Sequence, residues 1–344
     1  MFKKSFKWAI IYSIALVSFT LYAVLDTFVI PRTYAVVGTS LQTTSISPYS
    51  AVYSAISENT AVVSEASSAS VASVDSQNNS QENTSSDSVS SESVTTSVTP
   101  VITDNSYQDA NISITITQYR EYDTDIYVAD VQVSDVSYLK TAFAQGIYGR
   151  NVTEKTSTIA AENNAILAIN GDYYGAQNNG YVLRNGVLYR STASDSSQQD
   201  LVIYADGSFG IITEGQTSAQ ELLQSGAIQV LSFGPALIEN GSIAVSKNEE
   251  VDKAMTCNPR TAICMIDNLH YLLVVADGRT SASTGLSLYE MAQFLKTLGV
   301  QTAYNLDGGG SSTMVFNGEV INNPTTNGNR ITERSVSDIV CIGY

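Results

Sequence analysis

The chain opens with one long apolar block. Trp8 to Ile30 is a run of 23 residues that is apolar except for small hydroxyl residues and Asp26. A helix of that length spans about 35 Å, enough to cross a hydrocarbon core of about 30 Å. Three lysines, at positions 3, 4 and 7, precede the block, and Pro31–Arg32 closes it. Positive charge before a first span favours an N-terminus inside and the bulk of the chain outside. Residues 1–32 are therefore expected to be a cytoplasmic tip and a transmembrane signal-anchor.

A cleaved signal peptide is the alternative interpretation of the same block. Its apolar region would be unusually long, and the best small-residue cleavage motif is only Thr33–Ala35. Both interpretations place the rest of the chain outside the cytoplasm.

Residues 33–105 have the pattern of a disordered stalk. Between Ser64 and Thr99 there are 14 serines and four threonines, with no Lys, Arg, aromatic, Leu or Ile. Such a segment buries too little apolar surface to offset the entropy of ordering it. As a flexible coil it would have an end-to-end distance of roughly 50 Å. It could act as a spacer through a cell envelope, or as a linker of no particular length.

Alternating strands and hairpins begin near residue 106. Ile112, Ile114 and Ile116 alternate with polar residues, and the dipeptides Asn185-Gly186 and Asp206-Gly207 mark two hairpins. The segments expected to be strands are 111–119, 125–133, 165–169, 181–189, 201–212, 228–231, 261–266, 271–276, 303–306, 313–316 and 338–343. Strands outnumber helices, so residues 106–344 are expected to form a single α+β domain with a mainly antiparallel or mixed sheet.

Helices are expected at three places. Residues 154–163 have helical composition, and capping boxes stand at Ser218–Glu221 and Ser287–Glu290. The last box opens an apolar face that Gly299 ends.

The net negative charge of the chain argues against polyanionic partners. The chain has 33 acidic and 17 basic residues, and residues 106–344 alone carry a net charge of −12. A domain this acidic, with no basic stripe, is a poor binder of nucleic acid or of anionic lipid surfaces.

The strongest local motif is Asp307–Ser312, a run of Asp, three glycines and two serines after an apolar strand. Glycines allow backbone to approach a ligand closely, and successive N–H groups in such a turn form an anion site. No Gly-Lys-Ser/Thr follows, so the run is not a P-loop. We expect Gly308, Gly309, Gly310, Ser311 and Ser312 to bind substrate.

Four other strand ends carry charged or amide side chains beside Gly, Pro or Ser. Rigid scaffolds place catalytic groups in such loops, although each motif alone could be an ordinary turn. The side chains concerned are Asn170 and Asp172, Asn258 and Arg260, Asp277 and Arg279, and Arg334.

The order of these motifs resembles the phosphodiester glycosidase family. The similar segments are NGDYY at 170–174, FGPALIENG at 233–241, NPRTAICM at 258–265, VVADGR at 274–279 and NLDGGGSSTMVFNG at 305–318. The resemblance covers about residues 150–344, beyond the apolar block and the stalk. It implies hydrolysis of a sugar-1-phosphodiester at the glycosidic bond. Many relatives have Gly where this chain has Asp172, so the role of that carboxylate is left open.

The residue chemistry agrees with that activity. A phosphate monoester is a good leaving group, because its second pKa is about 6, and it needs charge stabilisation more than a proton. Arg260, Arg279 and the glycine loop could supply that stabilisation. Asp307 is expected to attack C1 or to activate water, with Asp277 orienting or assisting.

No cofactor is expected to be required. A Ca²⁺ ion is the rival use for Asp172, Asp277 and Asp307, but no EF-hand-like spacing exists. His270, the only histidine, is expected to be structural or solvated. Cys264 and Cys341 are expected in the core and could form a disulfide, which would leave Cys257 free.

The sequence thus predicts a membrane-anchored extracytoplasmic hydrolase that acts on a sugar-1-phosphodiester. A bacterial envelope with a phosphate-linked glycan is the expected setting. Two alternatives stay open: a metal-dependent phosphodiesterase that cleaves O–P, and a non-catalytic module for glycan binding or exopolysaccharide assembly.

Overall fold

The computed structural model of the chain describes residues 2–34, 99–249 and 257–344. Most of the expected stalk, 33–105, lies outside these ranges. Two short strands stand at its ends: β1 (Arg32–Thr33) and β2 (Val101–Ile102). Structure therefore reaches further into both ends of the segment than its composition indicates.

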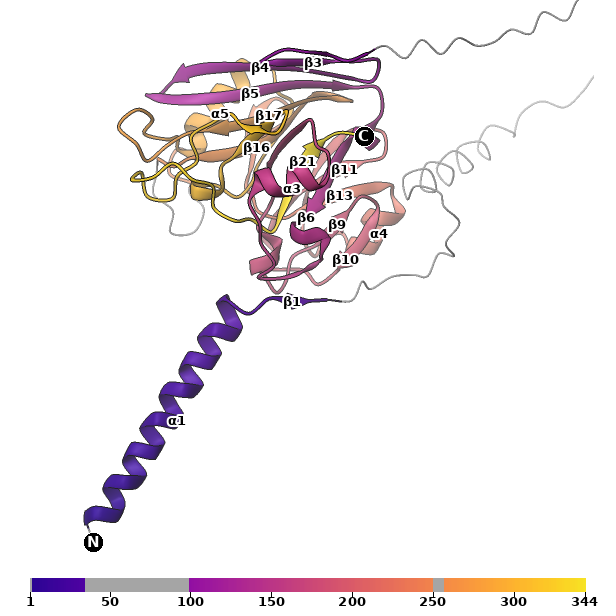
Figure 1. The fold of residues 1–344 in the computed structure, drawn as a ribbon. Coiled ribbons are helices and arrows are strands. Elements are labelled where there is room, and N and C mark those ends of the chain that lie inside the picture. The colour runs from indigo at the N-terminus through magenta and orange to yellow at the C-terminus, as the bar shows by residue number, and fades with distance from the viewer. Residues whose placement is uncertain (1, 35–98, 250–256) are drawn as a thin grey trace, which may run out of the picture.

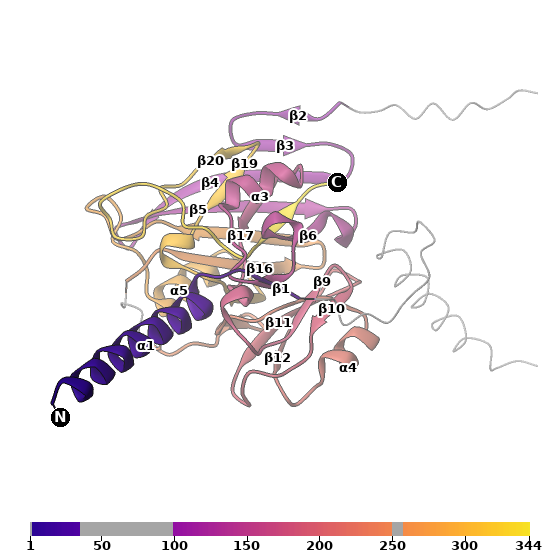
Figure 2. The same cartoon turned by 60° about the horizontal axis from the view of Figure 1, so that its bottom comes forward.

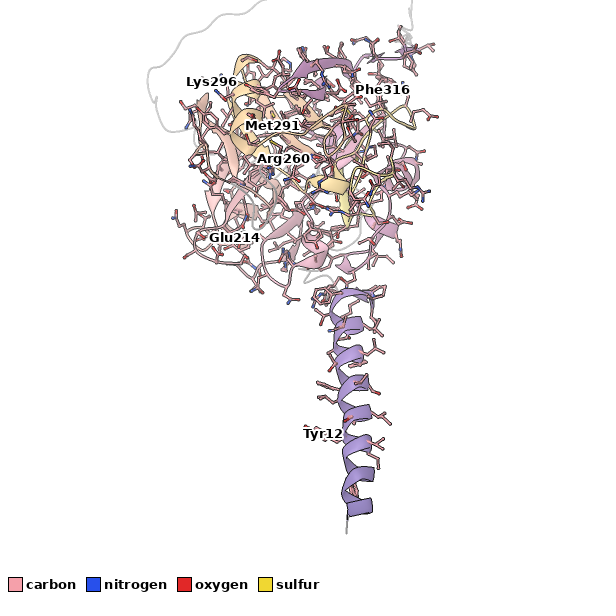
Figure 3. All side chains as sticks on the ribbon, turned by 90° about the vertical axis from the view of Figure 1, so that its left-hand side faces the viewer. Tyr12, Glu214, Arg260, Met291, Lys296 and Phe316 are labelled. Carbon is pink, nitrogen blue, oxygen red and sulfur yellow. The ribbon has the colours of Figure 1, made fainter. Side chains whose placement is uncertain are left out.

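The apolar block is helix α1 (Phe2–Phe28), which projects as a rod from the globular part of the molecule (Figure 1). Figure 3 shows Tyr12 on this rod, far from the globular part. The stretch Ile10–Phe28 is long and apolar enough to cross a membrane, as a signal sequence also would be.

The globular part contains three antiparallel sheets. The largest has nine strands in the order β15-β14-β18-β16-β17-β5-β4-β3-β2. Their bounds, besides β2, are β3 (Ser106–Gln108), β4 (Ile112–Glu121), β5 (Thr124–Val133), β14 (Ala236–Glu239), β15 (Ser242–Ile243), β16 (Arg260–Asp267), β17 (His270–Ala276) and β18 (Thr302–Asn305).

Each of the two smaller sheets has five strands. One runs β10-β9-β13-β11-β12, with β9 (Val182–Arg184), β10 (Val187–Arg190), β11 (Gln199–Tyr204), β12 (Phe209–Thr213) and β13 (Ala227–Leu231). The other runs β20-β19-β8-β21-β6, with β6 (Leu139–Phe143), β8 (Leu167–Asn170), β19 (Met314–Phe316), β20 (Glu319–Val320) and β21 (Asp338–Ile342). A separate pair joins β1 to β7 (Gly149–Arg150).

The helices match the expected positions. They are α3 (Thr156–Glu162), α4 (Ala219–Gln224) and α5 (Leu288–Thr297), with short 3₁₀ turns η1 (Val136–Tyr138), η2 (Ala144–Gly146), η3 (Tyr174–Ala176) and η4 (Gly309–Ser311). Both capping boxes form: Ser218 and Ser287 each accept the N–H of the glutamate three residues on, and that glutamate bonds back. The α+β class is confirmed.

The main core lies between the sheets. Ile114, Leu273 and Ile263 of the large sheet join Ile203 and Ile169 of the smaller sheets in one buried cluster. Helix α5 covers the other face of the large sheet through Leu288, Met291 and Leu295, and Figure 2 shows α4 beside the β9–β13 sheet. Because the sheets share one core, loops from different sheets meet at their strand ends.

Candidate active site

The glycine loop joins β18 to β19 and contains the single turn η4. Gly309 has φ +61°, a left-handed value that favours glycine. A Cβ added there would lie 2.9 Å from Nη2 of Arg279. The loop backbone and that guanidinium are therefore in direct contact, as the sequence predicts for a glycine needed for close approach.

Asp307 begins the loop and is held by two neighbours. Arg334 donates through Nη2 to Oδ1 and Oδ2 at 3.0 and 2.9 Å, and the Ser311 hydroxyl donates to Oδ2 at 2.6 Å. Nε of Arg334 also bonds to the Ser311 hydroxyl. Only 8% of Asp307 is exposed, and burial raises the pKa of its carboxyl while Arg334 opposes the shift.

Arg279 projects its guanidinium across the site. It has φ +60° and donates through Nε and Nη2 to Oδ1 of Asn258, at 3.2 and 2.8 Å, while Nη1 donates to the Thr326 carbonyl. These acceptors are neutral, so they fix the side chain without cancelling its charge. Burial, Arg334 and Arg260 together lower the pKa of Arg279. Three cations thus face one small region.

Arg260 begins β16, directly opposite Ala276 at the end of β17. That register sets Arg260 beside the turn that carries Asp277 and Arg279. Arg260 is 4% exposed and donates through Nε to the Leu286 carbonyl, and Figure 3 shows it inside the globular part.

Asp277 lies in the same network, held by two asparagines. Asn322 donates to Oδ1 at 3.0 Å, and Asn323 donates through its backbone N–H to Oδ1 and through its amide to Oδ2, at 2.9 Å each. Asn322 also donates to the Ser312 carbonyl and accepts the N–H of Met314. It therefore ties Asp277 to the glycine loop.

Asn170 supports the loop from below. It is fully buried and donates to the Asp307 carbonyl at 2.5 Å, while its Oδ1 accepts from Thr261 and from the N–H of Thr313. Its amide connects β8, β16 and the glycine loop, so Asn170 helps to hold the loop in position.

Comparison with known proteins agrees with this geometry. A phosphodiester glycosidase family model matches residues 163–343. The chain belongs to the phosphodiester glycosidase family.

Two individual proteins are similar to this chain in sequence. Human N-acetylglucosamine-1-phosphodiester alpha-N-acetylglucosaminidase is 32% identical over 193 residues, which cover 51% of this chain and 37% of that protein. An uncharacterized SPbeta prophage-derived protein of Bacillus subtilis (strain 168), YomE, is 27% identical over 203 residues, 57% of this chain and 31% of that protein. The chain thus spans about a third of the length of these relatives.

Solved structures share the fold. The zebrafish N-acetylglucosamine-1-phosphodiester alpha-N-acetylglucosaminidase catalytic domain, auto-inhibited by its pro-peptide, superposes with a TM-score of 0.53 at 23% identity. It covers 68% of this chain and 83% of that chain.

Asp172, the third predicted acid, is held by a buried arginine. Its Oδ2 accepts from Nη2 of Arg184 at 2.8 Å and from the N–H of Ser232 at 2.7 Å, and Oδ1 accepts the N–H of Tyr174. Asp172 is 0% exposed. The carboxylate is therefore engaged by a buried arginine and two backbone N–H groups, and a catalytic part for Asp172 beside Asp277 and Asp307 stays a prediction.

Asp338 completes that buried group. Arg184 donates to its Oδ2 at 2.9 Å, and burial and Asp172 raise the pKa of Asp338 to about 7. Sequence reasoning missed Arg184 and Asp338. The hairpin that carries Arg184 was predicted, but an arginine inside a strand gives no sign of facing inward.

The backbone N–H groups of the glycine loop are mostly occupied. Those of Gly309, Ser311 and Ser312 donate to the carbonyls of Pro259, Gly308 and Gly309. Three N–H groups of the loop are therefore engaged within the protein, and substrate binding by the loop stays a prediction. Gly310 packs against Thr326, because an added Cβ would lie 2.4 Å from the Thr326 hydroxyl oxygen.

The structure also describes the acids, cysteines and histidine that the sequence analysis discussed. Within the described residues, no group of three or more His, Cys, Asp or Glu side chains could hold a metal ion. The three cysteines, all in the described ranges, are unbridged, and Cys264 and Cys341 are buried in different sheets. His270 has a partner that the sequence did not indicate, Asp130, at 2.9 Å from Nε2.

Asn322 and Asn323, which hold Asp277, were also missed by the sequence analysis. They stand in an Asn-Asn-Pro run just after the β19–β20 hairpin. Adjacent amides before a proline, close to the glycine loop, are the signal that could have identified them.

Proposed function

We propose that the chain is a hydrolase that cleaves the glycosidic bond of a sugar-1-phosphodiester. The observation that carries the proposal is the contact of two arginines with one carboxylate loop: Arg334 bonds to Asp307, and Arg279 lies against Gly309. The charge of Arg260 acts on Arg279. Family membership and the names of the human and zebrafish relatives support this reaction class.

The arginines stabilise the negative charge of the leaving group. When the C1–O bond breaks, negative charge develops on the departing phosphate monoester. A preorganised cation in a partly buried site stabilises that charge. Arg279 suits this role, because its fork is oriented by the neutral Asn258 amide and keeps its full charge.

Asp307 serves C1. Its carboxylate attacks the anomeric carbon or takes a proton from the attacking water, and Arg334 and Ser311 hold it in one orientation. Asp277, fixed by Asn322 and Asn323, orients substrate or assists the proton transfer. Retention and inversion are both compatible with these roles.

The setting of this activity is a membrane surface outside the cytoplasm. Helix α1 would anchor the chain, and the three lysines before it would keep the N-terminus inside. The substrate would be a phosphate-linked glycan of a bacterial envelope. Recovery of a mature N-terminus after Ala23 or Ala35 would contradict the anchor.

Turnover in ¹⁸O-labelled water tests the reaction. Hydrolysis of a sugar-1-phosphodiester at the C–O bond puts the label in the sugar. Label in the phosphate would instead support a phosphodiesterase that cleaves O–P. Absence of turnover on a panel of activated sugar-1-phosphodiesters would favour a binding module.

A further inference from the structure

The segment just after α1 is bound to the globular part. Strand β1 pairs antiparallel with β7, with Arg32 opposite Arg150 and Thr33 opposite Gly149. The N–H of Tyr34 then donates to the Tyr148 carbonyl at 3.2 Å. The chain thus returns to its own domain within a few residues of the helix end.

Side chains reinforce this pairing. Asn151 donates through its amide to the carbonyls of Thr27 and Ile30, at 3.2 Å each, so it holds the end of the helix itself. The rings of Tyr34 and Tyr148 lie 5.8 Å apart. A Cβ on Gly149 would lie 2.3 Å from the Arg32 carbonyl oxygen, so this close approach depends on glycine.

The length of the connection places the domain relative to the helix. Three residues, Val29–Pro31, separate the end of α1 from β1. Three residues reach at most about 10 Å. The headgroup layer is about 5–8 Å thick on each side of the hydrocarbon core. Strand β7 therefore lies at or just above the headgroups once α1 spans a membrane.

The surface around β7 suits that position. Tyr34 and Ile147 are exposed at 45% and 37%, and Tyr173, beside η3, is exposed at 42%. Turn η3 packs on β7, where the N–H of Asn151 donates to the Gly175 carbonyl. Tyrosines are enriched at membrane–water interfaces, where one end is apolar and the other is wet.

We infer that β7 and η3 form a docking face that holds the catalytic domain against the outer leaflet through the segment Thr27–Tyr34. This inference rests on the proposed anchor. Because β1 fixes the domain directly to the end of α1, the distance of the domain from the membrane is set by Val29–Pro31. The enzyme would then act on phosphodiesters close to the lipid surface, not on polymer tens of ångströms away.

A cysteine cross-link tests the docking in the full-length protein in membranes. Arg32→Cys with Arg150→Cys puts thiols on directly opposed residues, whose Cα atoms lie about 4.5–5.5 Å apart, within disulfide range. The matched control is Arg32→Cys with Thr117→Cys, since Thr117 is exposed on β4, at the opposite end of the domain (Figure 1). Both carry Cys257→Ser, because Cys257 is exposed.

Copper-phenanthroline oxidation followed by peptide mapping gives the result. Docking predicts a disulfide in most Arg32→Cys/Arg150→Cys molecules and at least tenfold less in the control. Asn151→Gly, which keeps the φ of +56° accessible but removes both amide contacts, should slow cross-linking several-fold.

Equal, low cross-linking in the two pairs would overturn the docking. Carbonate extraction of the same membranes reports separately whether α1 is an anchor, and turnover of the uncross-linked protein reports the proposed activity. The failures of the anchor, the activity and the docking are therefore distinguishable.

Discussion

Arg334 holds both carboxylate oxygens of Asp307 with a single nitrogen, Nη2, at 3.0 and 2.9 Å. Burial favours the protonated form of Asp307, and the arginine favours the ionised form that attack on C1 requires. The protonation state of Asp307 therefore depends on the balance between burial and the charge of Arg334.

Replacing Arg334 should shift that balance. In Arg334→Gln the pKa of Asp307 rises further, so the acidic limb of kcat/KM, below which activity is lost, moves to higher pH. Loss of charge-assisted bonds of about 1.5–3 kcal/mol should lower activity roughly 10- to 100-fold. A pH–rate profile checks this. Arg334→Lys should recover part of the shift, and Arg120→Gln, which removes the exposed partner of Asp125, should change nothing. An unmoved limb would contradict the role given to Arg334.

Asp307 and Arg279 should differ in their dependence on the leaving group. Asp307→Asn keeps the shape but removes the carboxylate, so kcat should fall by orders of magnitude on every substrate. Arg279→Ala should cost about 2–4 kcal/mol on a sugar-1-phosphodiester and little on an aryl glycoside with a low-pKa phenol. Steady-state kinetics on both substrates decide it. Equal losses on both, with the fold intact by circular dichroism, would mean that Arg279 positions an aspartate instead of stabilising phosphate.

Gly309 should be required for activity because any side chain there would collide with Arg279, an effect that can be separated from backbone strain. Gly309→Ala puts a methyl group 2.9 Å from the Arg279 guanidinium, at a φ of +61°. Gly318→Ala is the control, because its φ is +85° and an added Cβ meets nothing within 4 Å. Both should lose about 1–2 kcal/mol of stability, but only Gly309→Ala should lose activity, by tenfold or more. Equal activities would show that the contact with Arg279 is dispensable.

Chelation should leave most of the activity intact. The proposed roles assign the phosphate charge to arginines and give no step to a metal. Assays after dialysis against EDTA, with and without added Ca²⁺ or Mg²⁺, test this. A complete loss that metal restores would assign Asp277 and Asp307 to coordination.

The pH dependence of stability should reveal Asp200. Burial and Glu214 raise the pKa of Asp200 to about 9, so the folded state holds a proton that the unfolded state releases near pH 4. Its stabilisation is complete below that pH and is lost as pH rises towards 9. Asp200→Asn mimics the protonated form and should reduce the fall in stability between pH 6 and 9 by about 1–3 kcal/mol. Denaturant melts at several pH values measure it.

Asp195→Asn provides the control for that experiment. Hydrogen bonds from Ser197 lower the pKa of this exposed carboxyl, so it is ionised throughout the range. The slope of stability with pH should therefore be unchanged in this variant. A wild-type slope in Asp200→Asn would assign the effect to another group.

Local signals in the sequence predicted much of the fold because they act over a few residues. Asn185-Gly186 adopts φ values of 50° and 76° in the turn between β9 and β10, and both capping boxes form. The strands β6 and β14 were not predicted, since Leu139–Phe143 and Ala236–Glu239 are short and lack clear alternation. β6 pairs with the distant β21, and β14 pairs with the distant β18 as well as with the adjacent β15.

The candidate site also has features that the sequence predicts and features that depend on tertiary contacts. The loop at Asp307 and the arginines beside it follow from glycine geometry and charge. The partner of Asp172 cannot be predicted in this way, because Asp172 pairs with Arg184 of β9, which also pairs with Asp338 of β21. Buried ion pairs depend on tertiary contacts, and strand-end motifs do not encode them.

Strand β21 lies between β8 and β6, although it follows every other described strand in the chain. Until residues 338–342 have been synthesised, β6 and β8 have no common neighbour and Arg184 lacks one of its two carboxylates. Folding of the domain should therefore be completed only after β21 has become available to pair with them. A premature stop before β21 would therefore leave two strand edges unpaired and a chain exposed to proteolysis.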